Sequence, residues 1–498
     1  MLNIRPPLLS DSEWEELHKF FPVTESYKHI ALEGQKRKNP SLEEQIRISK
    51  AADFLGVVAD THFQRKSAAD IHFGWSASTE IRLQTALKKI SEEFNDNSWS
   101  VFAYGKLGSF ELNLSSDVDL VWIRESGSAL DAKMLQRLRQ LVADNTSWGF
   151  GHRLDFDLRA GGRLGPMTSA LDEWVDYFSN YGEAWERLAF VRFRPLWGSS
   201  NLLSKATEAA QKFTYRRFLD FSLLESFKEL RQKIYEQNWQ RTKEGVVDLK
   251  LGLGGIRDLE LFVHTLQVVY GGKSPSVRLN STVGALYELQ KISAISAEDT
   301  DLLNDHYWRL RTFENLVQAK NDQQTHLLVE DEWQDYLSEN RLKDLKKDME
   351  RCRDIVSGFL GPINGQRRSL PESDEDQLAW LRSLGVQDET IENHWHSLAE
   401  EQVLSRQKER DDRWRKVFIF QFLTTAHEKG LDLNPLMPRL ADFVKKLKAK
   451  ATFFHLLVHN PGLTTQIVQL LGTSDFLGQI LIHRPELLDG FVYEQRPE

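Results

Sequence analysis

The sequence predicts an α+β protein that is mostly helical, with a small mixed sheet followed by helical bundles. Two observations carry this prediction. Over most of the chain, apolar residues recur at three- and four-residue spacing, which is the period of an amphipathic helix. Between residues 99 and 159, by contrast, short aromatic and β-branched segments alternate polar with apolar positions, which is typical of strands.

The expected elements follow one another in a simple order. Helical spacing covers residues 1–76 and continues over 77–94, and it returns after residue 166 with a glycine-rich break at 250–258. Strands are expected at 99–105, 117–123 and 152–159, with a helix over 128–147. The expected domains are a helical segment (1–76), an αβ core (77–165), a helical bundle (166–363), a polar linker (364–377) and a C-terminal helical segment (378–498).

Composition narrows the class of protein. The 64 basic and 73 acidic residues give a net charge of -9, which argues against nucleic-acid binding because no uniform basic field attracts phosphates. No leader pattern opens the sequence and no apolar run is long enough to span a membrane, so we expect a cytoplasmic protein. The single cysteine, Cys352, excludes an internal disulfide and a cysteine-cluster zinc site.

Two aspartates stand at the start of the second expected strand. In a strand, Asp117 and Asp119 point to the same side, while Val118 and Leu120 face the core. Neighbouring carboxylates repel each other unless a cation lies between them, and Mg²⁺ is the natural one. Asp155, on the next expected strand, is a third candidate ligand of the same ion.

The loop before these aspartates has the composition of a phosphate-binding turn. Gly105 and Gly108 allow close approach of the backbone, and Lys106 and Ser109 supply donors. Taken alone, the glycines make a tight turn and the aspartates cap a strand end in solvent. Taken together with the third acid, the loop and the paired aspartates favour a catalytic site.

These residues resemble a known family. Gly-Ser followed by Asp-x-Asp and a later strand aspartate resembles the polymerase-β-type nucleotidyltransferase core, and "YGKLGSFELNLSSDVDLVWI" is similar to the glutamine synthetase adenylyltransferase and adenylyl-removing enzymes. Four further segments resemble that family in the same order: "HRLDFDLRAGGRLGP", "YGEAWERLAFVRFRPLWG", "DLKLGLGGIRDLELFV" and "LRTFENLVQAKNDQQTHLL". The similarity extends from residue 45 to residue 492.

The resemblance implies an activity, a cofactor and partners. The wording "ELNLSSD" and "GGIRDLE" is closer to the family's adenylyl-removing half, which removes AMP from a tyrosine of glutamine synthetase by phosphorolysis and releases ADP. Adenylyl transfer from ATP to a tyrosine and a non-catalytic nucleotide- or regulator-binding unit are the alternatives. Mg²⁺ is the implied cofactor. The implied partners are glutamine synthetase, a PII-type signalling protein, ATP, ADP and phosphate.

The candidate site residues fall into two groups. Asp117, Asp119 and Asp155 are the expected catalytic residues and metal ligands. The expected nucleotide- and phosphate-binding residues are Gly105, Lys106, Gly108, Ser109, Ser116, Arg159, Arg192, Arg194, Lys250, Arg257 and Glu260. For Lys250, Arg257 and Glu260 the alternative is a helix start with surface ion pairs. Trp122 and Trp185 are expected in the core, and His326 is expected to pack rather than catalyse.

Some positions depart from the family pattern. Asp157 and Leu253 stand where the pattern has arginine, Ala160 where it has proline, and Ser109-Phe110 where it has Gly-Arg. The loss of positive charge implies weaker phosphate affinity, a changed substrate or lost activity. Alternatively, Asp157 faces the same way as Asp155 and is an additional metal ligand.

Overall fold

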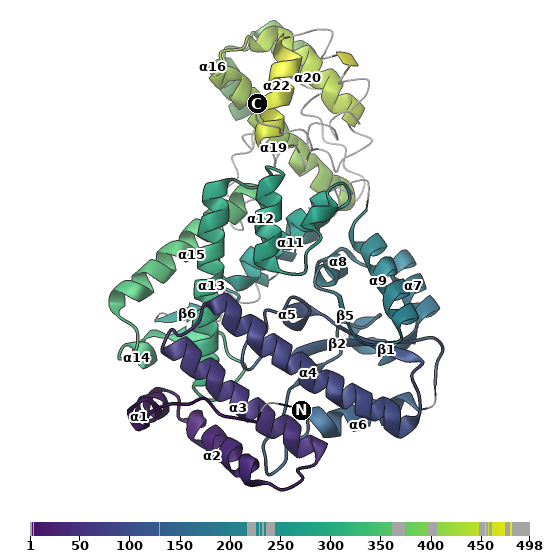
Figure 1. The fold of residues 1–498 in the computed structure, drawn as a ribbon. Helices are drawn as coiled ribbons and strands as arrows, with labels where there is room; N and C mark the ends of the chain where they lie inside the picture. The colour runs from purple at the N-terminus through teal and green to yellow at the C-terminus, as the bar shows by residue number, and fades with distance from the viewer. Residues whose placement is uncertain are drawn as a thin grey trace. The chain divides into compact units, whose positions relative to one another are not determined.

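The computed structural model describes most of the chain as two compact units (Figure 1). The described residues are 2, 4–128, 130–216, 226–228, 230–231, 234–235, 245–360, 374–395, 398, 406–447, 454, 457, 461–473 and 479–480. The first unit comprises Met1–Phe218 with Leu230–Ile355, and the second comprises Leu219–Glu229 with Val356–Glu498. Helices predominate beside a small mixed sheet, so the predicted α+β class is confirmed.

Four helices open the first unit: α1 (Asp11–Phe20), α2 (Val23–Lys36), α3 (Leu42–His62) and α4 (Ala68–Phe94). Ser10, Ser41 and Ser67 cap α1, α3 and α4, because each hydroxyl accepts a hydrogen bond from the backbone three residues later. The helical prediction for this region is confirmed. α4 runs without a break past residue 76, where the sequence suggested a domain boundary.

Five strands form the mixed sheet: β1 (Trp99–Ala103), β2 (Val118–Arg124), β3 (Leu154–Asp155), β4 (Thr168–Ala170) and β5 (Arg194–Gly198). β1 lies antiparallel between β2 and β5, while β3 and β4 both run parallel to β2. The register pairs Asp119 of β2 with Asp155 of β3. Chain segments far apart in sequence thus bring two of the expected carboxylates to neighbouring positions.

β3 is much shorter than the strand expected at 152–159. The Asp155 carboxylate accepts a hydrogen bond from the Asp157 backbone N–H at 2.6 Å, which folds the chain into a turn directly after the strand. Arg159 then donates to the carbonyls of Phe156 and Gly165, each at 2.9 Å, and holds the turn. The strand prediction failed here because side-chain bonds to the backbone compete with strand pairing.

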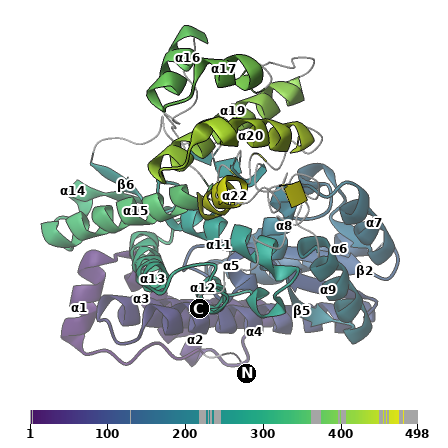
Figure 2. The same cartoon turned by 90° about the horizontal axis from the view of Figure 1, so that it is seen from above.

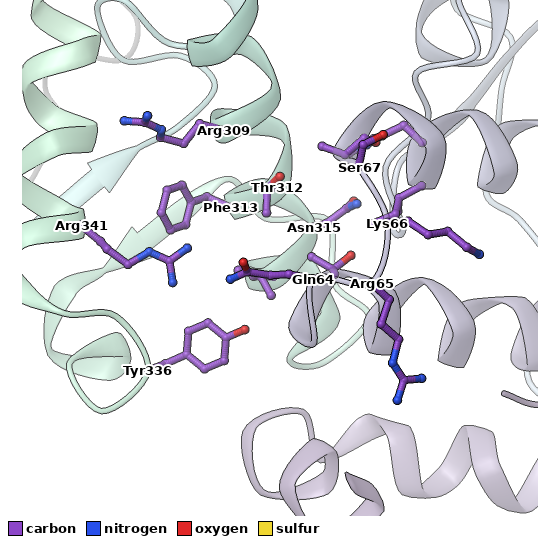
Figure 3. A pocket seen from close by; sticks show the side chains of 15 residues that line it. Gln64, Arg65, Lys66, Ser67, Arg309, Thr312, Phe313, Asn315, Tyr336 and Arg341 are labelled. Carbon is purple, nitrogen blue, oxygen red and sulfur yellow. The ribbon is translucent and has the colours of Figure 1, made fainter. Parts of the chain in front are cut away.

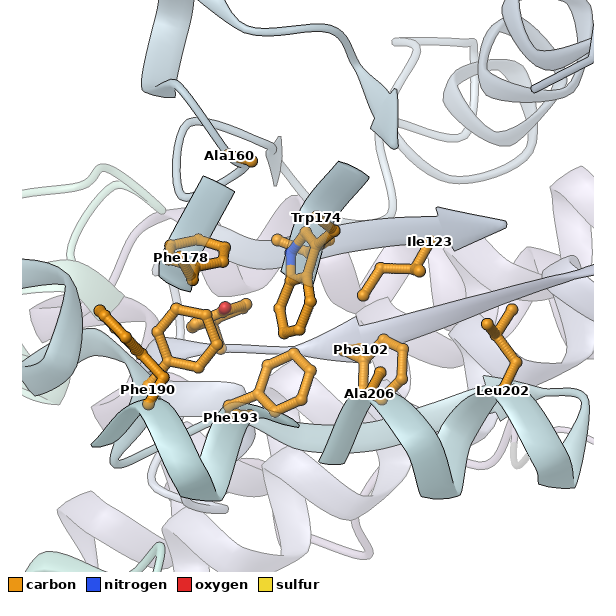
Figure 4. Packing of buried hydrophobic residues seen from close by; sticks show 13 residues of the cluster. Phe102, Ile123, Ala160, Trp174, Phe178, Phe190, Phe193, Leu202 and Ala206 are labelled. Carbon is orange, nitrogen blue, oxygen red and sulfur yellow. The ribbon is translucent and has the colours of Figure 1, made fainter. Parts of the chain in front are cut away.

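An aromatic core lies between the sheet and the helices α7 (Leu171–Asn180), α8 (Ala184–Phe190) and α9 (Ser200–Thr214), as Figure 4 shows. Phe102 of β1 stacks on Phe193 with ring centroids 4.5 Å apart, and Trp174 packs on both Phe190 and Phe193. Alternate strand residues face this core because successive side chains in a strand point to opposite faces.

Two tryptophans test the predicted core. Trp122 is buried and stacks on Trp99 with ring centroids 4.2 Å apart, so its prediction is confirmed. Trp185 is 40% exposed and lines a pocket, so the prediction that it belongs to the core is wrong. Its indole N–H donates to Glu183 at 2.9 Å on the outer side of α8.

Further helices complete the first unit. They are α6 (Asp131–Val142), α11 (Ile256–Gly271), α12 (Thr282–Lys291), α13 (Ala297–Ala319), α14 (Glu330–Trp333) and α15 (Glu339–Leu360), of which the last extends past the unit's final residue. β6 (Val246–Asp248) and β7 (Leu327–Val329) form a separate antiparallel pair. The sequence did not predict this pair, because three residues are too few to show an alternating pattern.

The described part of the second unit consists of α16 (Asp374–Ser383), α17 (Asp388–Thr390), a π-helical turn (Ile391–Trp395), α19 (Arg406–Glu428), α20 (Leu433–Leu447) and α22 (Pro461–Thr473). α19, α20 and α22 pack against one another (Figure 2). The expected linker 364–377 lies outside the described residues up to 373, and α16 begins at Asp374. None of the helices in the described parts of the chain is long and apolar enough to cross a membrane.

Candidate active site

The expected carboxylates meet at a pocket of about 440 Å³ in the first unit. Asp117 and Asp119 come from the start of β2, and Asp155 comes from the end of β3. Gly105, Lys106, Ser116, Arg192, Lys250, Arg257 and Glu260 also line this pocket. The structure therefore brings together residues that are up to 155 positions apart in the chain, from Gly105 to Glu260.

Gly105 is required by its surroundings. Its φ is +54°, in the left-handed region, and a Cβ atom at this position would lie 2.2 Å from Oδ2 of Asp119. Gly108 faces a similar restriction, since a Cβ atom there would lie 1.8 Å from the carbonyl oxygen of Arg192. Both glycines of the loop therefore allow close packing, one against a candidate ligand and the other against the backbone that precedes β5.

Asp119 carries an altered proton affinity. Burial and, next to it, the nearby carboxylates of Asp155 and Asp117 together raise the pKa of its carboxyl group to about 7, against the opposing effect of Lys250 and Lys106. Near neutral pH, uptake of a proton or a cation therefore relieves the repulsion among these three carboxylates.

The carboxylates differ in their present partners. Oδ2 of Asp117 accepts a hydrogen bond from Nε2 of Gln324 at 2.8 Å, and Asp155 accepts the Asp157 N–H described above. Within the described ranges, no group of three or more His, Cys, Asp or Glu side chains is arranged to hold a metal ion. Mg²⁺ takes only one or two protein carboxylates when waters and substrate phosphates complete its shell, so the paired aspartates of β2 fit that ion.

The cations at the pocket are of two kinds. Nζ of Lys106 lies 3.0 Å from the buried Glu314 of α13, and burial lowers the pKa of this lysine to about 7. Lys250 and the exposed Arg257, by contrast, have no carboxylate within ion-pair distance among the described residues. The free positive charge at the pocket thus comes from the glycine-rich segment before α11.

Arg192 and Glu260 form a buried ion pair at the back of the pocket. Nη2 of Arg192 lies 2.9 Å from Glu260 and 3.2 Å from Glu111, and it donates to the Thr282 hydroxyl at 2.6 Å. The Tyr307 hydroxyl donates to Glu111 at 2.7 Å and completes the network. With two carboxylates on one guanidinium, Arg192 has little charge left for a ligand.

Four expected phosphate-binding residues do not line the pocket. The Arg194 guanidinium pairs with Glu80 at 2.6 Å and lies over the Phe110 ring, 4.0 Å from its centroid. Arg159 holds the turn after β3, and Gly108 packs on Arg192. Ser109 is buried, and its hydroxyl donates to the Lys106 carbonyl at 3.2 Å. Their positions indicate structural contacts within the loop and the sheet.

Asp157 lines the pocket but is tied to its own turn. Its carboxylate lies 2.6 Å from Nε of Arg163 and 3.5 Å from Nη1 of Arg159. Because β3 ends at Asp155, Asp157 does not share a strand face with Asp155, contrary to the alternative drawn from the sequence. Two arginines thus already balance its charge.

Sequence reasoning missed several pocket residues. Gln324, Trp185 and His264 all line the pocket, and burial lowers the pKa of His264 to about 3, so this imidazole is neutral. Gln324 stands in the segment "NDQQTH", two residues before His326, and nothing in its neighbours along the sequence marks it as a pocket residue. His326 does not line the pocket, and its Nε2 lies 3.6 Å from Asp248.

The loop that leads into Asp117 is fixed by the helices around it. Glu111 accepts the Thr282 backbone N–H at 2.8 Å, and Oδ1 of Asn315 accepts from Nδ2 of Asn113 at 2.8 Å. The Ser115 hydroxyl donates to Asp322 at 2.6 Å. Glu111, Asn113 and Ser115, the alternate residues of "ELNLSSD", therefore attach this loop to the helices around it.

Comparisons with known proteins agree with this architecture. The family model of glutamate-ammonia ligase adenylyltransferase matches residues 71–209, and the model described as GlnD PII-uridylyltransferase matches residues 228–359. Curated proteins similar to this chain include bifunctional glutamine synthetase adenylyltransferase/adenylyl-removing enzymes. The one from Shewanella frigidimarina is 29% identical over 81% of this chain and 45% of its own length.

Two further relatives of the same description give the same picture. The enzyme from Shewanella loihica is 30% identical over 80% of this chain and 45% of its own length, and that from Mannheimia succiniciproducens is 26% identical over 89% and 49%. The chain thus spans about half the length of the curated relatives it matches. Motifs, fold and comparisons agree: over most of its length this chain is similar to the glutamine synthetase adenylyltransferase/adenylyl-removing enzymes.

Proposed function

We propose that this chain removes AMP from an adenylylated tyrosine of glutamine synthetase by phosphorolysis, and that ADP is the product. The observation that carries the proposal is one pocket that holds Asp117, Asp119 and Asp155 beside Lys250 and Arg257, two cations with no ion-pair partner in the described part of the chain. Carboxylates suited to Mg²⁺ and free cations suited to phosphate are the two requirements of phosphoryl-transfer chemistry.

In this proposal the residues divide the work. Asp117 and Asp119, with Asp155 beside them, would hold Mg²⁺, which when bound neutralises negative charge on the phosphoryl group. Lys250 and Arg257 bind the oxygens of the attacking phosphate, and Gln324 fixes the Asp117 carboxylate. A phosphate oxygen forms a bond to the AMP phosphorus, the bond from phosphorus to the tyrosine oxygen breaks, and the proton of hydrogen phosphate passes to the phenolate.

One feature supports removal of AMP over its addition. The segment "ELNLSSD" resembles the family's removing half, and its alternate residues anchor the loop to α12 and α13 through Glu111, Asn113 and Ser115. A PII-type protein as regulator is part of the proposal, since a PII-uridylyltransferase model matches residues 228–359.

The test supplies both directions of the reaction. Purified chain with Mg²⁺ is mixed with adenylylated glutamine synthetase and phosphate in one arm, and with unmodified synthetase and labelled ATP in the other. Release of ADP in the first arm alone, abolished by Asp117→Asn, supports the proposal. Label on the synthetase in the second arm alone supports adenylyl transfer instead, and nucleotide binding without either reaction supports a binding unit.

A further inference from the structure

A second cavity, of about 550 Å³, opens in the first unit away from the candidate active site. It lies between the end of α3 and the start of α4 on one side, and α13 with the segment before and into α15 on the other (Figure 3). It shares no lining residue with the pocket that holds the aspartates. Its volume is in the range that holds a small-molecule ligand.

The lining of this cavity favours an anion. Its fifteen residues include Arg65, Lys66, Arg309 and Arg341 and no aspartate or glutamate, in a chain whose net charge is -9. Three of these cations have carboxylate partners outside the cavity: Glu13 for Arg65, Asp60 for Lys66 and Asp348 for Arg309. They still make the local potential positive, although their charges are partly balanced.

Arg341 is the cation without such a partner. Among the described residues, no carboxylate lies within ion-pair distance of it. Its guanidinium carbon lies over the Phe313 ring, 6.0 Å from the ring centroid. Figure 3 shows its guanidinium directed across the cavity toward the side that carries Gln64. Gln64 has a φ of +52° because it is the left-handed residue that ends α3, where the Arg65 backbone N–H donates to the Asp60 carbonyl. Thr312 and Tyr336 add hydroxyl groups.

The inner wall of the cavity touches the loop that carries the aspartates. Asn315 lines the cavity, and its Oδ1 accepts hydrogen bonds from Nδ2 of Asn113 and, at 3.2 Å, from the Leu114 backbone N–H. His72 also lines the cavity, and its Nε2 lies 3.4 Å from the same Asn113 amide. A ligand that tightens this wall therefore tightens the segment leading to Asp117.

We propose that this cavity binds a small oxyanion-bearing metabolite, a carboxylate or a phosphate monoester, through Arg341, and that binding orders the loop 111–117. Only the link to catalysis depends on the proposed function, because binding and loop order are properties of the cavity itself. An oxyanion is the group that a planar guanidinium recognises best, through paired N–H donors.

Calorimetric titration of the full chain with succinate and with glycerol 3-phosphate tests the binding. Arg341→Ala is expected to weaken the tighter of the two probes by about tenfold or more, the effect of one charge-assisted contact. Lys343→Ala, a matched loss of charge on the exposed side of α15, leaves binding unchanged. Which probe binds more tightly separates the carboxylate from the phosphate source.

Hydrogen exchange at the Leu114 amide tests the coupling. The bound probe is expected to slow this exchange in wild type and not in Arg341→Ala. Binding of neither probe, or binding lost in Lys250→Ala but kept in Arg341→Ala, overturns the site; binding with unchanged exchange overturns the coupling. If binding and slowed exchange are both observed while AMP removal is not, the cavity stands and the proposed function fails.

Discussion

Asp119 sits under the backbone of Gly105 and between two other carboxylates, so its environment is set by three separate segments of the chain. The sequence showed that these groups share a strand face, because parity along a strand is a local property. It did not show which cations are free. Lys106 and Lys250 look alike in the sequence, but the partner of Lys106 is Glu314, which lies 208 positions away.

Gly105→Ala is expected to disrupt the site. The new methyl group collides with Asp119 and the residue keeps an unfavourable positive φ, so the free energy of unfolding should fall by about 1–3 kcal/mol and the proposed AMP removal should be lost. Urea denaturation measures the first effect. Gly127→Ala is the control, since a Cβ atom there meets nothing within 4 Å; equal effects of the two substitutions would contradict the steric account.

The stability of the metal-free protein should depend on pH through Asp119. Its pKa is about 7 in the folded protein against 3.8 for the ordinary group, so the folded state holds the extra proton between these values. The contribution of this group to stability is therefore fully present below pH 3.8 and is lost as the pH rises to about 7. In Asp119→Asn this decline should be reduced, as urea titrations at several pH values will show. An identical pH profile in both proteins would exclude the assignment.

At the scale of elements, the candidate site depends on helices that carry few of its reacting groups. α12 and α13 fix the loop 111–116, and α13 also holds Lys106. The sequence predicted these helices from their period but gave no sign of their contacts, because periodicity marks a buried face and not what covers it. The failed strand at 152–159 has the opposite cause, a local turn that overrides a correct alternation.

Asn113→Ala tests the anchoring of the loop. The substitution leaves the buried Oδ1 of Asn315 without its 2.8 Å partner, which should cost about 1–3 kcal/mol of stability. Activity should fall further than stability alone explains, because Asp117 is four residues away. Asn304→Ala on α13 is the control, because within the described residues the side-chain amide of Asn304 bonds only the adjacent Asp305. Full activity in a stably folded Asn113→Ala protein would show that this anchor does not position Asp117.

At the scale of the whole first unit, a buried ion pair connects an N-terminal helix with the segment that follows α13. Lys50 of α3 lies 2.7 Å from Asp322, which follows α13 and also accepts the Ser115 hydroxyl. Both side chains are almost fully buried, and Tyr27 of α2 bonds the same carboxylate. The sequence could not predict this pair, because the two residues are 272 positions apart and no local pattern marks them as partners.

Lys50→Met should destabilise the first unit by about 3 kcal/mol, since it leaves the Asp322 carboxylate buried without a cation. The double variant Lys50→Met with Asp322→Asn should recover part of this loss, because asparagine tolerates the φ of +48° and carries no charge. Thermal and urea unfolding of the three proteins gives the comparison. Equal destabilisation by the single and double variants would mean that shape, and not the unpaired charge, controls the effect.

The long separation between Asp117 and Gln324, and between Lys106 and Glu314, also has a consequence for biosynthesis. A ribosome releases the paired aspartates some two hundred residues before it releases the groups that orient them, as the separations of 207 and 208 positions show. The nascent chain therefore carries every carboxylate of the site while it is still inert. The candidate site should therefore reach its final geometry only once α13 and the segment after it have emerged and packed against the rest of the unit.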